Sequence, residues 1–116
     1  MTLEESDQEA EAVAVGPRVK LEDIVAQIDA KIFSLGDALI AEGDEVPGPL
    51  QRLTICVLIM RNGFTFVGTS SCVHPENFDA ALGERLAYEK AINQAWSHEG
   101  YLLQDKLFRE SGGEAF

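Results

Sequence analysis

The chain has 116 residues, which is enough for one domain of ordinary size and too few for two. Apolar residues make up 46% of the sequence, so a hydrophobic core can form, and the composition argues against wholesale disorder. With 20 acidic and 9 basic residues the net charge is −11, and the clustered bases that phosphate contacts need are missing. We therefore expect no direct binding to nucleic acid.

The N-terminal residues have the wrong chemistry for a leader peptide. Residues 1–16 are acidic, rich in alanine and without periodicity, which predicts a disordered acidic tail. The longest apolar run, residues 55–60, is far too short to span a membrane. These features predict a cytoplasmic protein with no membrane contact. It would form a single domain over residues 17–110, followed by a frayed tail over residues 111–116.

The first ordered segment has the spacing of a short amphipathic helix. Its apolar residues recur at i, i+3, i+4 and i+7, and they are Leu21, Ile24, Val25 and Ile28. This spacing predicts a helix that ends near Lys31. Residues 32–40 fit either the start of a strand or a turn, and residues 41–49 carry the glycines and prolines of a loop.

Residues 53–72 form the clearest element, a β-hairpin. Its first strand, residues 53–60, is apolar on both faces, as expected of a strand that is buried on both. In a chain this small, one face would pack on the domain's own helices and leave the other for a second subunit. The strand therefore predicts a homo-oligomer, a dimer or higher.

The turn of this hairpin has a strong local signal. Asn62 and Gly63 are typical of a type I′ turn, in which both central residues need positive φ. Such a turn would place Ile59 opposite Phe66. It would also leave Cys56 and Cys72 out of register for a disulfide, so we expect two free thiols.

Helices are predicted after the hairpin. An apolar stripe at helical spacing predicts a long helix from about Pro75 to Trp96. Gly100 would break or kink it, and residues 101–109 would form a short final helix. With the short N-terminal helix and a small antiparallel sheet centred on the hairpin, these helices make an α+β domain.

The sequence has none of the common catalytic motifs, neither GxSxG, a Walker loop, HExxH nor GxGxxG. His74 and His98 have no ligand partner nearby in sequence and fit surface or capping roles. We therefore expect a protein that is not an enzyme and that holds no metal and no cofactor.

A first group of polar residues lies at the end of the hairpin. Ser70 and Ser71 close the return strand, and Asn77 lies where the next helix should begin. Hydroxyl and amide groups beside a helix start can bind an anion. The same groups serve equally well as ordinary caps and turns, and the sequence leaves both interpretations open.

A second group follows the long helix. Arg85, Glu89 and Asn93 succeed each other at four-residue spacing, with Tyr88 alongside. One interpretation is an exposed ion pair between Arg85 and Glu89, worth a few tenths of a kcal/mol. The other is a recognition stripe with a base for phosphate, an amide for a ribose or base edge and an aromatic ring for stacking.

Five stretches carry a resemblance. They are residues 53–58, 61–64, 75–79 and 86–92, and Trp96 with Gly100 and Tyr101. In this order they resemble a family of small tailed-phage proteins named after gene product forty-nine of phage N-four and gene product sixty-six of phage Sf-six. Residues 17–24 resemble the start of that family, so the resemblance covers residues 17–107. The chain departs from the pattern at Lys20, often a capping Thr, and at Ser97, commonly a Pro.

For most members of this family the resemblance implies no activity. It extends to a phage protein of similar architecture, the first Thoeris anti-defence protein, which sequesters cyclic ADP-ribose signals and in some cases cyclic oligonucleotides. It thus implies an anti-defence sponge, a symmetric oligomer that binds a nucleotide-type immune signal without turnover. Candidates for its ligand site, by chemical type alone, are Arg85, Asn93, Lys106 and Arg109.

The acidic charge supports a second hypothesis of another class. An acidic tail and a net charge of −11 fit a protein–protein interaction module that inhibits or modifies a basic host protein. Deletion of residues 1–16 discriminates between the two hypotheses. It should weaken a partner steered by charge and leave a pocket binder intact.

Overall fold

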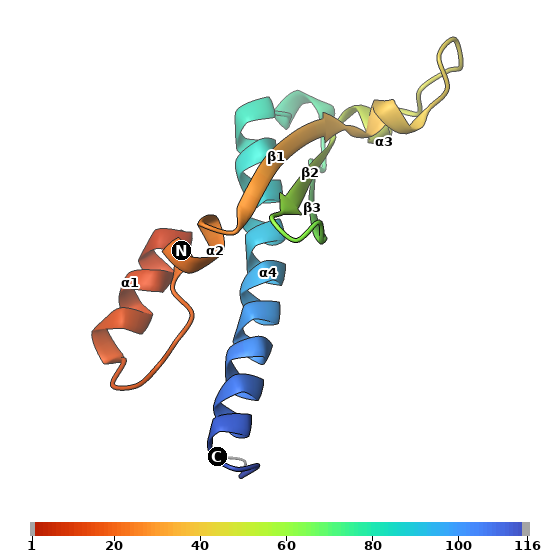
Figure 1. The fold of residues 1–116 in the computed structure, drawn as a ribbon. Helices are drawn as coiled ribbons and strands as arrows, with labels where there is room; N and C mark the ends of the chain where they lie inside the picture. The colour runs from red at the N-terminus through yellow and green to blue at the C-terminus, as the bar shows by residue number, and fades with distance from the viewer. Residues whose placement is uncertain (1, 115–116) are drawn as a thin grey trace. The chain divides into compact units, whose positions relative to one another are not determined.

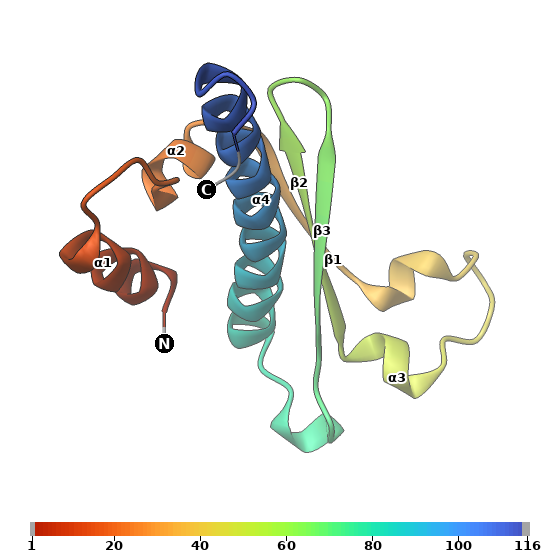
Figure 2. The same ribbon diagram turned by 90° about the horizontal axis from the view of Figure 1, so that it is seen from below.

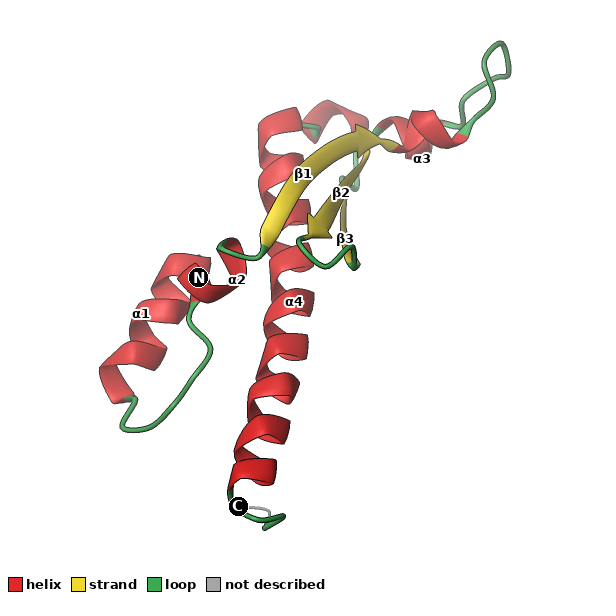
Figure 3. Cartoon of the chain, viewed as in Figure 1, coloured by secondary structure: helices red, strands yellow, loops and turns green. Residues whose placement is uncertain are grey.

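The computed structural model describes residues 2–114 of the chain. The chain folds into two compact units. One consists of residues 28–92, and the other combines the N-terminal residues up to 27 with the C-terminal residues from 93 onward. Figures 1 and 3 show the helices and strands of both. The single domain predicted over residues 17–110 stays a prediction.

The unit of residues 28–92 is built on an antiparallel sheet with the strand order β1-β2-β3. The strands are β1 (Ile28–Leu35), β2 (Leu53–Met60) and β3 (Thr65–Ser71). The connection from β1 to β2 holds a 3-10 turn, η1 (Gly36–Leu39), and the short helix α3 (Gly48–Gln51). The first part of the long helix α4 (Ala80–Glu110) lies beside the sheet (Figure 2). The predicted α+β class is confirmed.

Small residues let the sheet approach α4 closely. A β-carbon at Gly68 of β3 would overlap the backbone of Ala87 and Ala91 on α4. Both alanines are fully buried, as are Cys56 and Leu58 of β2. Only glycine fits at this point of the sheet, because the helix backbone takes the space of a side chain.

The opposite face of the sheet is only partly covered. We call it the outer sheet face, and its apolar residues include Ile32, Ile55, Val57, Ile59 and Val67. Those on β2 are half-buried, whereas Ile32 and Val67 are 49% and 43% exposed. The strand β2 is thus apolar on both faces, as predicted, but only the face toward α4 is buried by the described chain.

The hairpin turn is one residue longer than predicted. Met60 N–H donates to the Phe64 carbonyl at 2.8 Å, so the loop consists of residues 61–63. Among the described residues only glycines have positive φ, and Gly63 is at +88°. The loop is therefore a type I turn closed by a glycine bulge, and the predicted type I′ turn is wrong. The Asn62 side chain favours this form by accepting the Phe64 N–H at 3.0 Å.

The longer turn shifts the strand register by one residue. Ile59 pairs with Thr65 rather than with Phe66, and Cys56 pairs with Gly68. A shift of one residue exchanges the two faces of a strand. It turns Phe66 and Gly68 toward α4, and both are buried. The two cysteines are free thiols, as predicted.

The helix predicted to end near Lys31 is shorter. Helix α2 spans Leu21–Val25, and β1 begins three residues later. Ile28 fits the helical spacing but pairs with Met60, and Lys31 lies in the strand opposite Leu58. Pairing with β1 satisfies the backbone hydrogen-bonding groups along one edge of the apolar strand β2. This gain outweighs one more helical turn after α2.

The segment predicted to be a disordered tail contains helix α1 (Leu3–Val13), so that prediction is wrong for these residues. Thr2 caps the helix by accepting the Glu5 N–H at 3.0 Å. Leu3 is buried, and the acidic side chains of α1 find a partner in Arg18. Composition alone does not reveal such a partner.

Helix α4 is continuous through Gly100, so the predicted final helix over residues 101–109 is its last part. It begins at Ala80 instead of Pro75, which opens a separate 3-10 turn, η2 (Pro75–Asn77). One glycine costs a helix about 1 kcal/mol, which a long run of good helix formers can absorb. No helix in the described chain is long and apolar enough to cross a membrane.

The end of α4 is capped rather than frayed. Gly112 has a φ of +81° and donates to the Arg109 carbonyl, and Gly113 donates to the Phe108 carbonyl at 2.9 Å. These bonds form a Schellman motif, which satisfies the last carbonyls of the helix. The predicted frayed tail is therefore wrong for residues 111–113, and residues 115–116 lie outside the described part.

Candidate functional site

A cavity of about 200 Å³ lies in the unit of residues 28–92, where β3 ends and the chain turns toward α4. We call it the hairpin-end cavity. Its apolar wall includes Phe78, Leu82 and Leu86. Its polar lining consists of Arg52, Thr54, Ser70, Ser71, Asn77 and Asp79. The structure thus brings together Ser70, Ser71 and Asn77, which are the first predicted group.

Arg52 supplies the positive charge of the cavity. It follows α3 directly, and its Nε donates to the Cys72 carbonyl at 2.8 Å. The backbone N–H of Cys72 returns a bond of 3.2 Å to the Arg52 carbonyl. The terminal nitrogens of Arg52 have no hydrogen bond or ion pair within the described chain. They form a planar fork that suits the oxygens of an anion.

Thr54 carries an unsatisfied polar atom in this cavity. The residue is 2% exposed, and its Oγ1 has no hydrogen-bond partner among the described residues. Gly83 of α4 packs against it, since a β-carbon there would lie 2.5 Å from Oγ1. A buried hydroxyl without a partner costs about 1–3 kcal/mol. A polar group bound in the cavity would remove that cost.

The start of α4 is already occupied by an acid. Asp79, and not Asn77, accepts the Leu82 N–H, through Oδ1 at 3.0 Å, and so caps the helix. Asn77 remains exposed in η2 and lines the cavity. Because Asp79 neutralises the positive end of the helix, the capacity to hold an anion rests on Arg52.

Arg85 and Tyr88 lie on α4 in the same unit but do not line this cavity. The Arg85 side chain is 58% exposed and pairs with Glu89 at 3.4 Å. The Tyr88 ring lies 4.7 Å from Lys31 Nζ, a cation–π distance. Of the two interpretations of this group, the geometry at Arg85 corresponds to the exposed ion pair with Glu89.

The remaining predicted residues belong to the other unit. Lys106 pairs with Glu110 at 3.9 Å, and Arg109 pairs with Asp105 at 2.9 Å. Both are exposed pairs at four-residue spacing, worth a few tenths of a kcal/mol. Asn93 is exposed. None of these residues contributes to the hairpin-end cavity.

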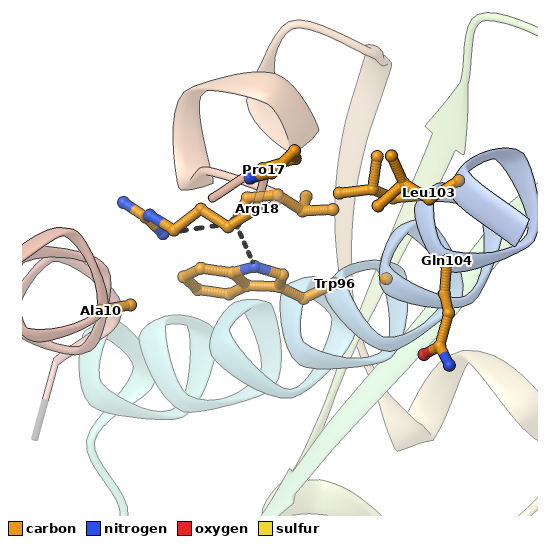
Figure 4. A pocket seen from close by; sticks show the side chains of 9 residues that line it. Ala10, Pro17, Arg18, Trp96, Leu103 and Gln104 are labelled. Carbon is orange, nitrogen blue, oxygen red and sulfur yellow. Dashed lines mark hydrogen bonds between the residues drawn. The ribbon is translucent and has the colours of Figure 1, made fainter. Parts of the chain in front are cut away.

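A larger cavity of about 490 Å³ lies within the unit that contains α1 and the end of α4. We call it the Trp96 groove, and Figure 4 shows its side chains. Its lining is mainly apolar and includes Pro17, Val19, Trp96, Gly100, Leu103 and Leu107. The indole Nε1 of Trp96 donates to the Val19 carbonyl at 3.0 Å, which fixes the ring.

The one charged side chain that lines the Trp96 groove is neutralised within its unit. Arg18 binds Asp7 at 3.0 Å and Glu11 at 2.9 Å (N···O), and its side chain is only 15% exposed. Asp7 Oδ1 also accepts the Leu21 N–H at 3.0 Å. This backbone bond, reinforced by Arg18, holds the pKa of Asp7 below its ordinary value of 3.8.

The described residues contain no group of three or more His, Cys, Asp or Glu side chains placed to bind a metal. Burial raises the pKa of the Cys56 thiol. His74 Nδ1 accepts the Glu76 N–H at 3.2 Å, in agreement with a capping role. The side chains that line the hairpin-end cavity suit polar binding.

Arg52 is the functional candidate that sequence reasoning missed. The available signal was its place directly before the apolar strand 53–60. With the correct register, Leu53 pairs with Ser71, which sets Arg52 opposite Cys72 at the end of the hairpin. The predicted turn instead placed Leu53 opposite Cys72, which shifts the partner of Arg52 by one residue.

A family model described as the phage protein (N4 Gp49/phage Sf6 gene 66) family matches residues 19–107, well over half of the chain. Neither a curated protein nor a solved structure matches this chain.

Proposed function

The chain belongs to the phage protein (N4 Gp49/phage Sf6 gene 66) family, and we propose that it sequesters a nucleotide-type immune signal without turning it over. The ligand class is a cyclic ADP-ribose isomer or a cyclic oligonucleotide, and the role is that of an anti-defence sponge. The hairpin-end cavity supports this proposal, because Arg52 there has free N–H groups beside hydroxyl and amide side chains. Such a set suits a phosphate and its sugar.

The size of the cavity limits what one chain holds. Its volume of about 200 Å³ is below the roughly 300–1,000 Å³ of ordinary ligand pockets. It suits one phosphate with part of a sugar, so the rest of a cyclic nucleotide needs another surface. A second copy of the chain would supply it, and the outer sheet face is available for that association.

Isothermal titration against cyclic ADP-ribose isomers and cyclic di- and trinucleotides tests the proposal. We expect saturable heat with at least one ligand, and the Arg52→Gln variant should bind it at least tenfold more weakly. That factor corresponds to about 1.4 kcal/mol. The control is Arg61→Gln, which makes the same charge change at an exposed position of the hairpin turn.

Arg52 also holds the Cys72 backbone, so a milder variant guards against a structural effect. Ser71→Ala removes one exposed hydroxyl from the lining and should weaken binding severalfold. Absence of heat with every ligand contradicts the proposal. Release of a cleaved product during incubation contradicts sequestration and favours a hydrolase.

A further inference from the structure

We propose that the Trp96 groove is a docking site for a basic amphipathic helix of a partner protein. This inference concerns a different unit of the chain from the hairpin-end cavity and goes beyond the binding of a nucleotide. It rests on the shape of the groove, on its open floor at Gly100 and on the charges of its unit.

The groove has the shape and lining that accept a helix. One wall is a stripe of α4 at helical spacing, Trp96, Gly100, Leu103 and Leu107, and the other comes from α1 and residues 17–19. Figure 4 shows Ala10 of α1 facing Trp96 across the groove. A groove of this kind takes the apolar side chains of a helix at i, i+4 and i+7.

Gly100 leaves the floor of the groove open. Apart from its chain neighbours and its own helix backbone, no described atom lies within 4 Å of a β-carbon built at this glycine, although the residue lines the groove. An apolar side chain of an occupant therefore has room above Gly100, between Trp96 and Leu103. The indole ring beside it is half-buried and held by Val19, so the contact surface is already formed.

The charges of this unit select a cation. Its bases are Arg18, Lys20, Lys106 and Arg109, and all but Lys20 are paired with carboxylates of the same unit. Glu99 lies one turn from both Trp96 and Leu103 on α4 and has no ion pair within the described chain. Glu4 and Glu9 of α1 are likewise exposed without one. Lysines flanking an apolar stripe would find these carboxylates, whereas an anionic helix would be repelled.

The groove includes residues that the family match does not cover. The match begins at residue 19, so α1 and the cluster of Arg18 with Asp7 and Glu11 lie outside it. Most of one wall of the groove, α1 with Pro17 and Arg18, thus lies outside the residues that the family model matches.

Trp96 is the single tryptophan of the chain and lines the groove, so its fluorescence can report binding there. The probe is a synthetic helix of about 14 residues with leucines at i, i+4, i+7 and i+11 and lysines flanking them. We expect a saturable change in Trp96 fluorescence when it is added to the full chain. Two comparison peptides should bind at least tenfold more weakly, one with the same composition scrambled and one with every lysine replaced by glutamate.

A matched pair of substitutions locates the binding. Gly100→Phe fills the open floor and should weaken the peptide at least tenfold, whereas Gly100→Ala adds one methyl group and should leave it within twofold. Circular dichroism should show intact helix in both. The proposal is overturned if Gly100→Phe binds like the unmodified chain, or if the scrambled peptide binds equally well. It is also overturned if Trp96 fluorescence changes with protein concentration alone and Gly100→Phe abolishes that change, because the occupant is then a second copy.

Discussion

At Gly68 the structure has room for a hydrogen atom but not for a methyl group. The backbone of Ala87 and Ala91 occupies the place of a β-carbon, and backbone cannot rotate away as a side chain can. Gly68→Ala should therefore push α4 from the sheet and lower the free energy of unfolding by about 2–3 kcal/mol. Urea denaturation followed by circular dichroism measures the loss.

Gly100→Ala is the control for this prediction. Apart from its chain neighbours and its own helix backbone, no described atom lies within 4 Å of the new methyl group, and alanine favours a helix over glycine by up to about 1 kcal/mol. This variant should be as stable as the original chain or more so. Equal stability of Gly68→Ala and the unmodified protein would contradict the close packing of β3 on α4.

The sequence locates some site residues and not others, for a physical reason. Ser70, Ser71 and Asn77 lie within one stretch of chain, so their proximity could be predicted from local order. The ion pair of Arg85 with Glu89 follows from helical spacing in the same way. Arg52 joins the site only through the pairing register of β2 with β3, which depends on the number of residues in the distant hairpin loop.

Helix α1 depends on a carboxylate that receives two kinds of donor. Asp7 accepts the Leu21 N–H and binds Arg18, and the lowered pKa of Asp7 records the stabilisation of its charged form. This stabilisation is fully present above the ordinary value of 3.8 and is lost as the pH falls through the lowered one. We expect α1 to loosen below a pH of about 3.8.

Amide chemical shifts of α1 across an acid titration measure this loosening. Asp7→Asn keeps an oxygen for Leu21 but removes the charge that binds Arg18, so at neutral pH its α1 shifts should resemble those of the original chain in acid. Glu9→Gln, an exposed change on the same helix without an ion pair, should titrate like the unmodified protein. Identical titrations for all three chains would show that Asp7 does not hold α1.

Elements defined by local spacing could be predicted, and their boundaries could not. The strands β2 and β3 and most of α4 follow from pattern. Ile28 satisfies the helical period and a strand pairing equally, and only the presence of β2 decides between them. Gly100 signals a helix end locally, but the neighbouring turns carry α4 through it. The order of α1 comes from Arg18, which lies outside the acidic segment.

At the scale of the molecule, the outer sheet face is only partly covered within the unit of residues 28–92. Ile32, Val57 and Val67 form one row across the three strands, since Val57 pairs with both of the others. A contiguous apolar sheet face is typical of a protein interface. We expect the chain to associate through it and to sediment at no less than twice its mass of 12.7 kDa.

Val57→Lys tests this association, because a lysine in the centre of an apolar interface would have to be buried without a partner. The variant should sediment as a 12.7 kDa monomer, whereas Gln51→Lys, the same addition of charge at an exposed residue of α3, should keep the oligomer.

The monomeric variant also distinguishes the proposal of nucleotide binding in the hairpin-end cavity from the proposal of peptide binding in the Trp96 groove. Because one hairpin-end cavity is too small for a cyclic nucleotide, Val57→Lys should lose nucleotide binding. The Trp96 groove is complete within one chain, so the same variant should bind the basic peptide unchanged. A monomeric original chain that still binds nucleotide tightly would refute the need for a second copy and leave the groove unaffected.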